Sequence, residues 1–480
     1  MNSYKNLINN TIVYFIGILG SKLISFFLVP LYTHYLSTAE YGTADLITVS
    51  AAFLLPMITL GVYEAILRYS MDKHTDKNQV IKNALIIFGL SYIVFVLISP
   101  IFTLFGLGKT EIIYLYVLVF FESLSMILGQ YARGLGYSKS FAFNGILKTL
   151  LTGVLNIIFI VYLDMGVRGY MFALILANLG STVYLFFRTK VFSRLIKSSF
   201  DKNLSKLMLK FSLPLVPNSI MWSLINSSSK YIIRYNLGAA ANGLFAISTK
   251  IPTIINMGST VFSQAWQLSI IQEYEEDRDT EDFYTSIFRM YSTFLLIIAS
   301  LLIVFIKPVL NLLFAEEYFN AWKPVPLLIM GAVFSAFSGF IGSVYTASKN
   351  TRGTLKTSIF GSAISLITNL LLIPRVGLLG AGLSSMISYF VMFIMRYYDT
   401  IDYIYLTINW KQLISTIVLI MVQTIILFLN LGTKLELIVL LIIFLIILII
   451  NRKGIYSTFD LVLRFIKSIF KGKKKAEDKK

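Results

Sequence analysis

Long apolar stretches separated by short polar segments run through the whole chain. A helix that crosses a bilayer needs about 20 mostly apolar residues, and the sequence contains fourteen stretches that approach or exceed this length. They cover approximately residues 8–32, 45–67, 83–105, 111–132, 141–162, 168–187, 211–235, 243–268, 284–306, 324–347, 356–374, 378–398, 412–430 and 435–450. The stretches at 211–235 and 243–268 are the least regular, because polar residues interrupt both. The pattern predicts an all-α polytopic membrane protein with about fourteen transmembrane helices.

The composition agrees with this interpretation. Of the 480 residues, 56% are hydrophobic and only 14% are charged, whereas a soluble domain carries roughly 25% charged residues. The chain has no cysteine, which excludes disulfides and thiolate metal sites. Its two histidines, His34 and His74, lie far apart along the chain, so we expect neither a metal site nor a cofactor.

The net charge of +18 comes from 42 basic and 24 acidic residues. Such an excess suggests nucleic acid binding in a soluble protein, but in a membrane protein it reports orientation, because cytoplasmic loops collect Lys and Arg. With a cytoplasmic N-terminus, 31 of the 42 basic residues fall in cytoplasmic segments. We therefore expect both termini in the cytoplasm and no nucleic acid partner. No loop is long enough for a separate folded domain, so the function must lie within the membrane.

The second half of the chain repeats features of the first at a lag of about 200 residues. The matching pairs are Glu40-Tyr41-Gly42 with Asn242-Gly243, Tyr137–Lys139 with Ala347–Lys349, Asn156 with Asn369, and Gly166–Gly169 with Gly377–Gly382. The repeat predicts an N-lobe of six helices over residues 1–200 and a pseudo-symmetric C-lobe of six helices over 201–400. Residues 401–480 then hold two extra helices and a basic tail. Parallel repeats of this kind are typical of transporters.

A proline followed by a glycine interrupts the second helix of each copy. These are Pro56 with Gly61, and Pro252 with Gly258. Interrupted helices at corresponding positions point to a substrate site between the repeats. An ordinary kink, which membrane helices tolerate, is the other explanation.

Ionisable residues inside the predicted helices are costly and usually face a cavity or a partner. The candidate cavity cations are Lys22, Lys250, Lys230, Lys148 and Arg234. Snorkelling to an interface is the alternative for Lys148, Lys230 and Arg234. Glu122 and Glu64 are candidates for ion coupling or for partners of these cations. Glu64 also lies four residues before Arg68, which favours a simple ion pair within one helix.

Several motifs resemble those of polysaccharide-type flippases. They are Pro30-Leu31-Tyr32, Glu40-Tyr41-Gly42, and the segment from Asn369 to Gly382 with its spaced glycines. Because of these motifs, the count of fourteen spans and the basic C-terminus, the chain resembles Wzx-type oligosaccharide flippases. These belong to the multidrug/oligosaccharidyl-lipid/polysaccharide superfamily, which also contains the MATE transporters.

The resemblance implies a V-shaped, MATE-like bundle in the bacterial cytoplasmic membrane. It also implies alternating access that carries oligosaccharides linked to undecaprenyl pyrophosphate to the outer leaflet, for capsule, O-antigen or exopolysaccharide synthesis. Membrane lipids, a polysaccharide polymerase and chain-length machinery are the implied partners, and coupling to H⁺ or Na⁺ stays open. Lys22 and Lys250 match by helix and depth the family's cavity cations, which are often Arg. Such cations would offset the cost of moving a pyrophosphate through an apolar layer.

Three other functions compete with this one. A lipid II flippase for peptidoglycan would share the helix count and the cationic cavity. A MATE-type drug or cation antiporter would have twelve helices and a carboxylate-rich cavity, against the four lysines and two glutamates found within the spans here. A membrane enzyme would show a large outer loop with paired charges, which this sequence lacks. We therefore expect a transporter that is not an enzyme.

Overall fold

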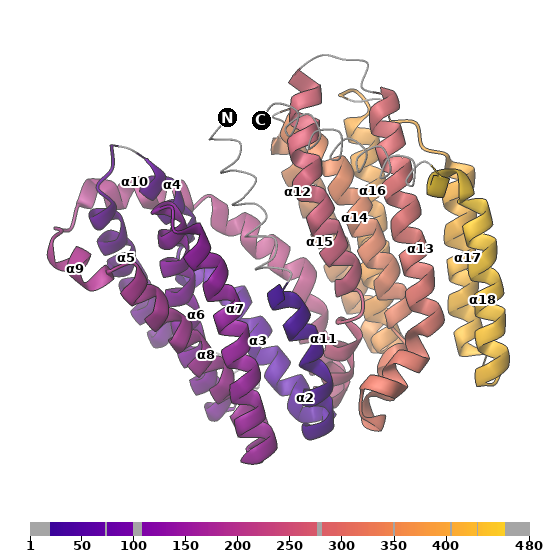
Figure 1. Cartoon of the computed structure of the whole chain (residues 1–480), viewed down its shortest axis with the longest axis horizontal. Helices are drawn as coiled ribbons and strands as arrows, with labels where there is room; N and C mark the ends of the chain where they lie inside the picture. The colour runs from indigo at the N-terminus through magenta and orange to yellow at the C-terminus, as the bar shows by residue number, and fades with distance from the viewer. Residues whose placement is uncertain are drawn as a thin grey trace, which may run out of the picture. The chain divides into compact units, whose positions relative to one another are not determined.

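The computed structural model describes residues 20–72, 74–98, 108–275, 281–348, 351–403, 406–429 and 431–456. Throughout these ranges the regular elements are helices, which are labelled in Figure 1. The all-α membrane fold predicted from the sequence is confirmed. The basic tail after residue 456 and the beginning of the first predicted span lie outside the described residues.

The helices follow one another with short connections. After a helix over residues 20–27 come α2 (Val29–Tyr35), α3 (Thr38–Ile58), α4 (Val62–Met71), α5 (Lys77–Ile98), α6 (Lys109–Gly134), α7 (Ser138–Asn156), the π-helix η2 (Ile157–Tyr162), α8 (Gly166–Arg188), α9 (Val191–Ile196), α10 (Lys202–Ser212) and α11 (Leu215–Ser248). The second part holds α12 (Thr253–Glu275), α13 (Glu281–Leu313), the 3₁₀-helix η3 (Glu316–Trp322), α14 (Val325–Ala347), α15 (Thr351–Val376), α16 (Leu378–Thr400), α17 (Trp410–Phe428) and α18 (Thr433–Ile450).

Eleven helices in the described ranges are long and apolar enough to cross a membrane. They correspond to eleven of the fourteen predicted spans. The other three predicted spans fall on residues 20–35, on α11 and on α12. The polar residues that made 211–235 and 243–268 irregular are the reason α11 and α12 fall short in hydropathy. The structure is therefore consistent with fourteen spans.

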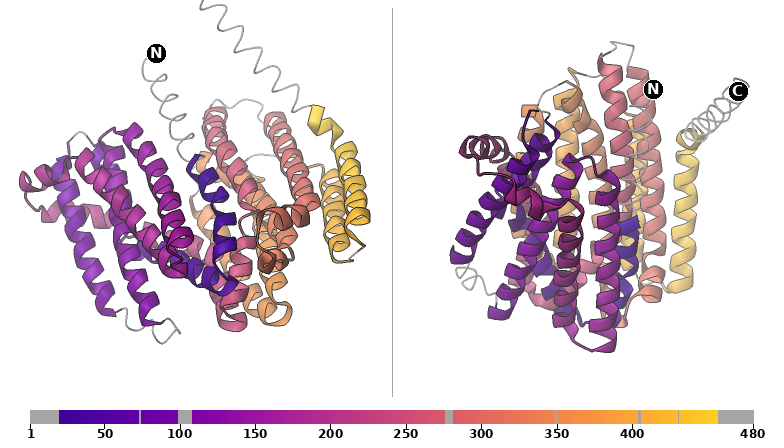
Figure 2. Two further views of the ribbon diagram at one scale, coloured as in Figure 1. Left: turned by 60° about the horizontal axis from the view of Figure 1, so that its bottom comes forward. Right: turned by 60° about the vertical axis from the view of Figure 1, so that its left-hand side comes forward.

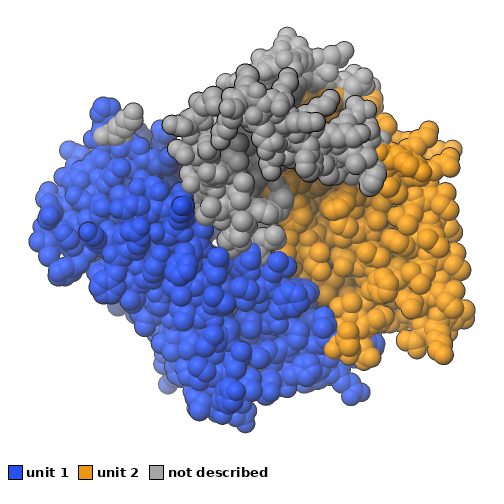
Figure 3. Space-filling view, in the orientation of Figure 1, with its two compact units in different colours: residues 1–247, 313–320, 369–378 blue, residues 248–312, 321–368, 379–480 orange. Residues whose placement is uncertain are grey.

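The chain divides into two compact units, which Figure 3 colours separately. Unit 1 comprises Met1–Ile247, Leu313–Asn320 and Asn369–Leu378, and unit 2 comprises Ser248–Leu312, Ala321–Thr368 and Leu379–Lys480. Unit 1 thus includes α10 and nearly all of α11, beyond the boundary at residue 200 that the repeat suggests. The division into two equal lobes stays a prediction.

Unit 1 is built around an apolar core shared by α3, α4, α5, α6 and α8. Fully buried members include Ile66, Val119, Tyr131 and Met171. The short helix α10 is amphipathic, with Leu204 and Met208 buried and its lysines exposed. In unit 2, α17 and α18 run side by side as an antiparallel pair (Figures 1 and 2).

Both helices that carry the predicted prolines are interrupted. Pro56 is buried in the last turn of α3, and the chain then passes through Leu60 and Gly61, whose φ angles are 48° and 65°. Positive φ is routine for glycine but costly for leucine, so the break is firmly imposed by its surroundings. The other break covers residues 249–252 and ends at Pro252, while Gly258 lies inside α12. A hinge function for either break stays a prediction.

Candidate functional site

Unit 1 contains a buried ion pair between α3 and α11. The Lys230 ammonium donates hydrogen bonds of 3.0 and 2.7 Å to the two carboxylate oxygens of Asp45. Both side chains are about nine-tenths buried. Two charges removed from water are tolerable only when they satisfy each other closely, and this geometry does so. Within the described residues, Lys230 is thus neutralised and not free to bind an anion.

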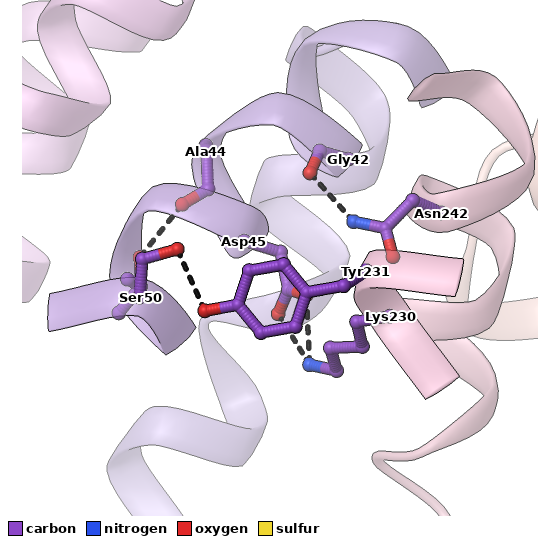
Figure 4. A network of polar contacts seen from close by, with 8 residues as sticks. Gly42, Ala44, Asp45, Ser50, Lys230, Tyr231 and Asn242 are labelled. Carbon is purple, nitrogen blue, oxygen red and sulfur yellow. Dashed lines mark hydrogen bonds and ion pairs between the residues drawn. The ribbon is translucent and has the colours of Figure 1, made fainter. Parts of the chain in front are cut away.

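Other polar contacts join the same two helices on either side of this pair (Figure 4). A hydrogen bond of 2.9 Å links the hydroxyls of Ser50 and Tyr231. Gly42 lies one turn before Asp45 on α3, and its carbonyl accepts a hydrogen bond of 2.8 Å from the amide of Asn242, which follows a kink in α11 at Gly238 (φ 87°). We call this set of contacts between Gly42, Asp45, Ser50 on α3 and Lys230, Tyr231, Asn242 on α11 the α3–α11 seam.

The start of α3 is fixed independently. Ser37 accepts from the Glu40 amide, and the Glu40 carboxylate accepts from the Ser37 amide, which forms a capping box. The Thr38 hydroxyl donates to the Glu317 carboxylate at 2.6 Å. Next to it, the Tyr318 hydroxyl donates to the Leu36 carbonyl at 2.9 Å. Burial and the nearby Glu317 raise the pKa of Tyr318, so its hydroxyl remains a donor. The segment 313–320 thus holds the end of the seam.

A tyrosine cluster packs behind this end of α3. Tyr32, Tyr41, Tyr170 and Tyr318 make ring contacts with centroids 5.0 to 6.4 Å apart. Tyr32 also accepts a hydrogen bond of 3.0 Å from the Asn156 amide, directly before the π-helix. Three of the four rings are buried. The three buried tyrosines therefore pack within unit 1 and do not offer exposed stacking faces to sugars.

Two of the predicted cavity cations lie on neighbouring helices of unit 1. The helix over residues 20–27 packs on α7, since a Cβ at Gly145 would lie 3.6 Å from the Ser21 hydroxyl. Lys22 on the first helix is exposed, and Lys148 on α7 is half-buried. Among the residues that the structure describes, neither ammonium group has a hydrogen bond or an ion pair.

The remaining predicted cations lie on other elements of the chain. Arg234 is half-buried, one turn after Lys230 on α11. Lys250 lies in unit 2, half-buried in the break before α12, where its carbonyl accepts from the Thr253 amide at 3.2 Å. A common cavity for Lys22 and Lys250 stays a prediction.

The two predicted carboxylates are both half-buried in unit 1. Glu122 on α6 has no hydrogen bond or ion pair within the described residues, and the hydroxyl of the adjacent Ser123 is also buried without a partner. Glu64 begins α4 without forming an ion pair with Arg68, whose side chain is exposed. The described ranges hold no group of three His, Asp or Glu side chains suited to a metal ion.

Asp45 is the residue that sequence reasoning missed. It stands at the first position of the second predicted span and looks like part of a polar loop. A signal was nevertheless present, because a lysine within a membrane helix needs an anionic partner and Lys230 has none on its own helix. The partner is 185 residues away, and only the fold brings the two together.

Comparisons with known proteins agree with this architecture. The family model described as "Polysaccharide biosynthesis protein" matches residues 7–267, more than half of the chain. The capsular polysaccharide biosynthesis protein CapF of Staphylococcus aureus is 26% identical over 207 residues, which are 42% of this chain and 52% of CapF. An uncharacterized membrane protein of Methanocaldococcus jannaschii is 29% identical over 99 residues, which are 21% of this chain and 20% of that protein. The chain thus spans about a fifth to a half of these relatives.

Solved structures show the same fold at low identity. The lipid II flippase MurJ in an inward closed conformation has a TM-score of 0.68 at 14% identity, covering 94% of this chain and 100% of MurJ. An inward-facing multidrug resistance MATE family transporter of the MOP superfamily has a TM-score of 0.61 at 15% identity, covering 80% of this chain and 94% of the transporter. Because the family model matches more than half of the chain, this chain belongs to the polysaccharide biosynthesis protein family.

Proposed function

We propose that this protein is a flippase that carries oligosaccharides linked to undecaprenyl pyrophosphate from the inner to the outer leaflet of the cytoplasmic membrane. The observation that carries the proposal is the family match over residues 7–267. The transporter fold supports it, because that fold is shared with proteins titled as a lipid II flippase and as multidrug transporters. The fold alone does not separate these substrates.

The α3–α11 seam is the proposed outer gate of the transport cycle. By the distribution of basic residues, α3 begins on the outer side, so Gly42 and Asp45 lie at the outer end of their helix. The ion pair favours a seam that is either closed or fully open. When the seam is closed, the two charges satisfy each other, and when it is fully open, water solvates both. A half-open seam does neither and is disfavoured.

This arrangement gives the predicted cations different tasks. Lys22 and Lys148 are unpaired within the described residues and are the proposed first contacts of the pyrophosphate. Lys230 is held by Asp45 while the seam is closed and becomes available to an anion only as the seam opens. Lysine suits such a transient partner, because its ammonium is a flexible point charge without the rigid fork of arginine.

The decisive experiment measures substrate movement directly. The purified protein is reconstituted into vesicles that carry fluorescent lipid-linked oligosaccharide extracted from the source cells, and a membrane-impermeant reagent destroys the fluorescence of the outer leaflet. A flippase makes the protected fraction accessible within minutes, whereas empty vesicles keep about half of the label protected. Lipid II in parallel vesicles separates the two lipid-linked substrates.

A matched variant makes the assay specific. Lys22→Ala removes the exposed cation and should slow the movement, while Lys109→Ala removes an exposed cation at the predicted outer end of α6 and should not. Movement of lipid II in preference to the oligosaccharide would contradict the proposal, as would movement of neither lipid by a folded protein.

A further inference from the structure

Unit 2 has a small polar pocket at the end where α13 and α17 begin and α18 ends. The pocket is open to solvent on one side, and its cavity volume is only about 30 Å³. Polar residues of its lining come from α13, α17, the end of α18 and the connection before α17, and include Thr285, Arg289, Thr407, Asn409, Gln412 and Asn451. None of the predicted site residues belongs to it, and it takes no part in the proposed flipping step.

The walls of the pocket are fixed by hydrogen bonds. The Thr285 and Thr407 hydroxyls are 3.0 Å apart, which ties α13 to the connection before α17. The Gln412 amide donates to Asn451 at 3.0 Å, and the Asn451 amide donates to Thr416 at 3.0 Å. Asn451 is only 2% exposed. A buried polar network of this kind holds its members in one arrangement, so the pocket is already formed before a ligand arrives.

The charge of the pocket favours an anion. Arg289 is the one ionisable residue in the lining, and its side chain is exposed. Within the described part of the chain, no ion pair involves Arg289. Asn409 caps the start of α17, so the positive end of a membrane-length helix opens toward the same space. A phosphate group, which accepts several hydrogen bonds from a guanidinium and neighbouring amides, fits this chemistry.

The surroundings indicate a lipid as the source of that phosphate. Along the helices away from the pocket, α17 and α18 expose apolar side chains over most of their length. Examples are Ile414 and Val418 on α17, and Leu445 and Ile449 on α18. At the level of the pocket this apolar surface gives way to exposed Lys411, Arg452 and Lys453. That transition is typical of the boundary between acyl chains and headgroups. A ligand at this depth would have its phosphate in the pocket and its chains on α17 and α18.

We propose that this pocket binds the phosphate of an anionic phospholipid and that Arg289 is the charged partner of the phosphate. The acyl chains of the lipid then lie along α17 and α18. The site belongs to the inner leaflet by the predicted topology. Its ligand is a lipid of the surrounding bilayer, so the proposal does not rest on the flippase function.

The test is a titration of the detergent-solubilised protein with phosphatidylglycerol or phosphatidylcholine, read as the shift of the thermal unfolding midpoint. Phosphatidylglycerol should stabilise the protein more than phosphatidylcholine does. Arg289→Gln should weaken the apparent affinity for phosphatidylglycerol about fivefold, the effect of one basic residue near an anionic surface. Arg289→Lys should restore part of it. Lys139→Gln, which removes an exposed cation from unit 1 at the same predicted side, should change nothing.

Three outcomes would overturn the proposal. The first is an equal response of the Arg289→Gln and unchanged proteins to phosphatidylglycerol. The second is an Arg289-dependent shift with inorganic phosphate alone that equals the lipid effect, which would make the ligand a free anion. The third is an Arg289-dependent preference for undecaprenyl phosphate over phosphatidylglycerol, which would make the pocket part of the substrate path.

Discussion

Gly42 and Gly243 bring α3 and α11 into contact backbone to backbone. A Cβ at Gly42 would overlap the Ala239 carbonyl oxygen, and a Cβ at Gly243 would overlap the Thr38 carbonyl oxygen. Real side chains do not approach backbone atoms this closely, so any larger residue would push the helices apart. The two glycines therefore set the spacing between the start of α3 and the part of α11 that follows its kink at Gly238.

We predict that Gly243→Ala prevents closure of the seam. The alanine methyl group would clash with the backbone of α3, and such overpacking typically lowers the free energy of unfolding by about 1–3 kcal/mol. Thermal unfolding of the purified protein should occur at lower temperature, and transport should fall. The control is Gly89→Ala on α5, where a Cβ would meet nothing within 4 Å, and which should be neutral or slightly stabilising. Normal stability and transport in the Gly243→Ala variant would mean that the seam spacing is unimportant.

The Asp45–Lys230 pair should behave as a coupled unit. Asp45→Leu or Lys230→Met alone leaves a buried charge without its partner, which costs about 3–5 kcal/mol of folding free energy. A double variant, Asp45→Leu with Lys230→Met, replaces both charges by apolar groups and should recover much of that loss. Denaturant unfolding of the four proteins gives the coupling free energy directly. Additive effects of the two single changes would show that the side chains act independently.

Opening of the seam can be followed with a single thiol, because the chain has no cysteine of its own. Ser50 is 7% exposed, so the thiol of a Ser50→Cys variant should react slowly with a membrane-impermeant maleimide. Addition of the lipid-linked substrate should accelerate the labelling as the protein cycles. Tyr235→Cys on α11 is the control, since Tyr235 is 90% exposed and should label rapidly in every state. If the labelling rate of the Ser50→Cys thiol does not change when substrate is added, the seam is not a gate.

The sequence predicted the fold more completely than the site. Hydropathy located eleven spans that the structure bears out, because a membrane helix must be apolar over a bilayer's thickness. Proline and glycine act locally, so Pro56 and Gly61 indicated the break between α3 and α4, although hydropathy treated residues 45–67 as one span. The pairing of Asp45 with Lys230 could not be derived in this way, because it depends on which faces of two distant helices meet. Pro252 indicated a second break. Hydropathy treated residues 243–268 as one span, but this range covers the end of α11 and much of α12.

Lys307 on α13 makes polar contacts with both α17 and α18. Its ammonium donates to Glu436 at 2.8 Å and to the Leu427 carbonyl at 2.7 Å, and lies 4.5 Å from the centre of the Trp322 ring. We predict that Lys307→Met loosens α17 and α18 from α13, because Glu436 is left buried without its cation. Hydrogen exchange should accelerate at the ends of α17 and α18 and not in unit 1. Lys434→Gln, an exposed change on α18, should leave exchange unaltered.

Lys22 offers the sharpest separation of folding from transport. Within the described residues its exposed ammonium has no polar partner, so Lys22→Ala should leave the unfolding temperature unchanged. A hydrogen bond to a charged group is worth about 1.5–3 kcal/mol, so loss of a contact to pyrophosphate should slow flipping by about tenfold or more. Lys22→Arg keeps the charge and should retain most of the rate. A similar drop for Lys22→Arg and Lys22→Ala would mean that the shape of the side chain matters, not its charge. An unchanged rate for Lys22→Ala would place the substrate path elsewhere in the protein.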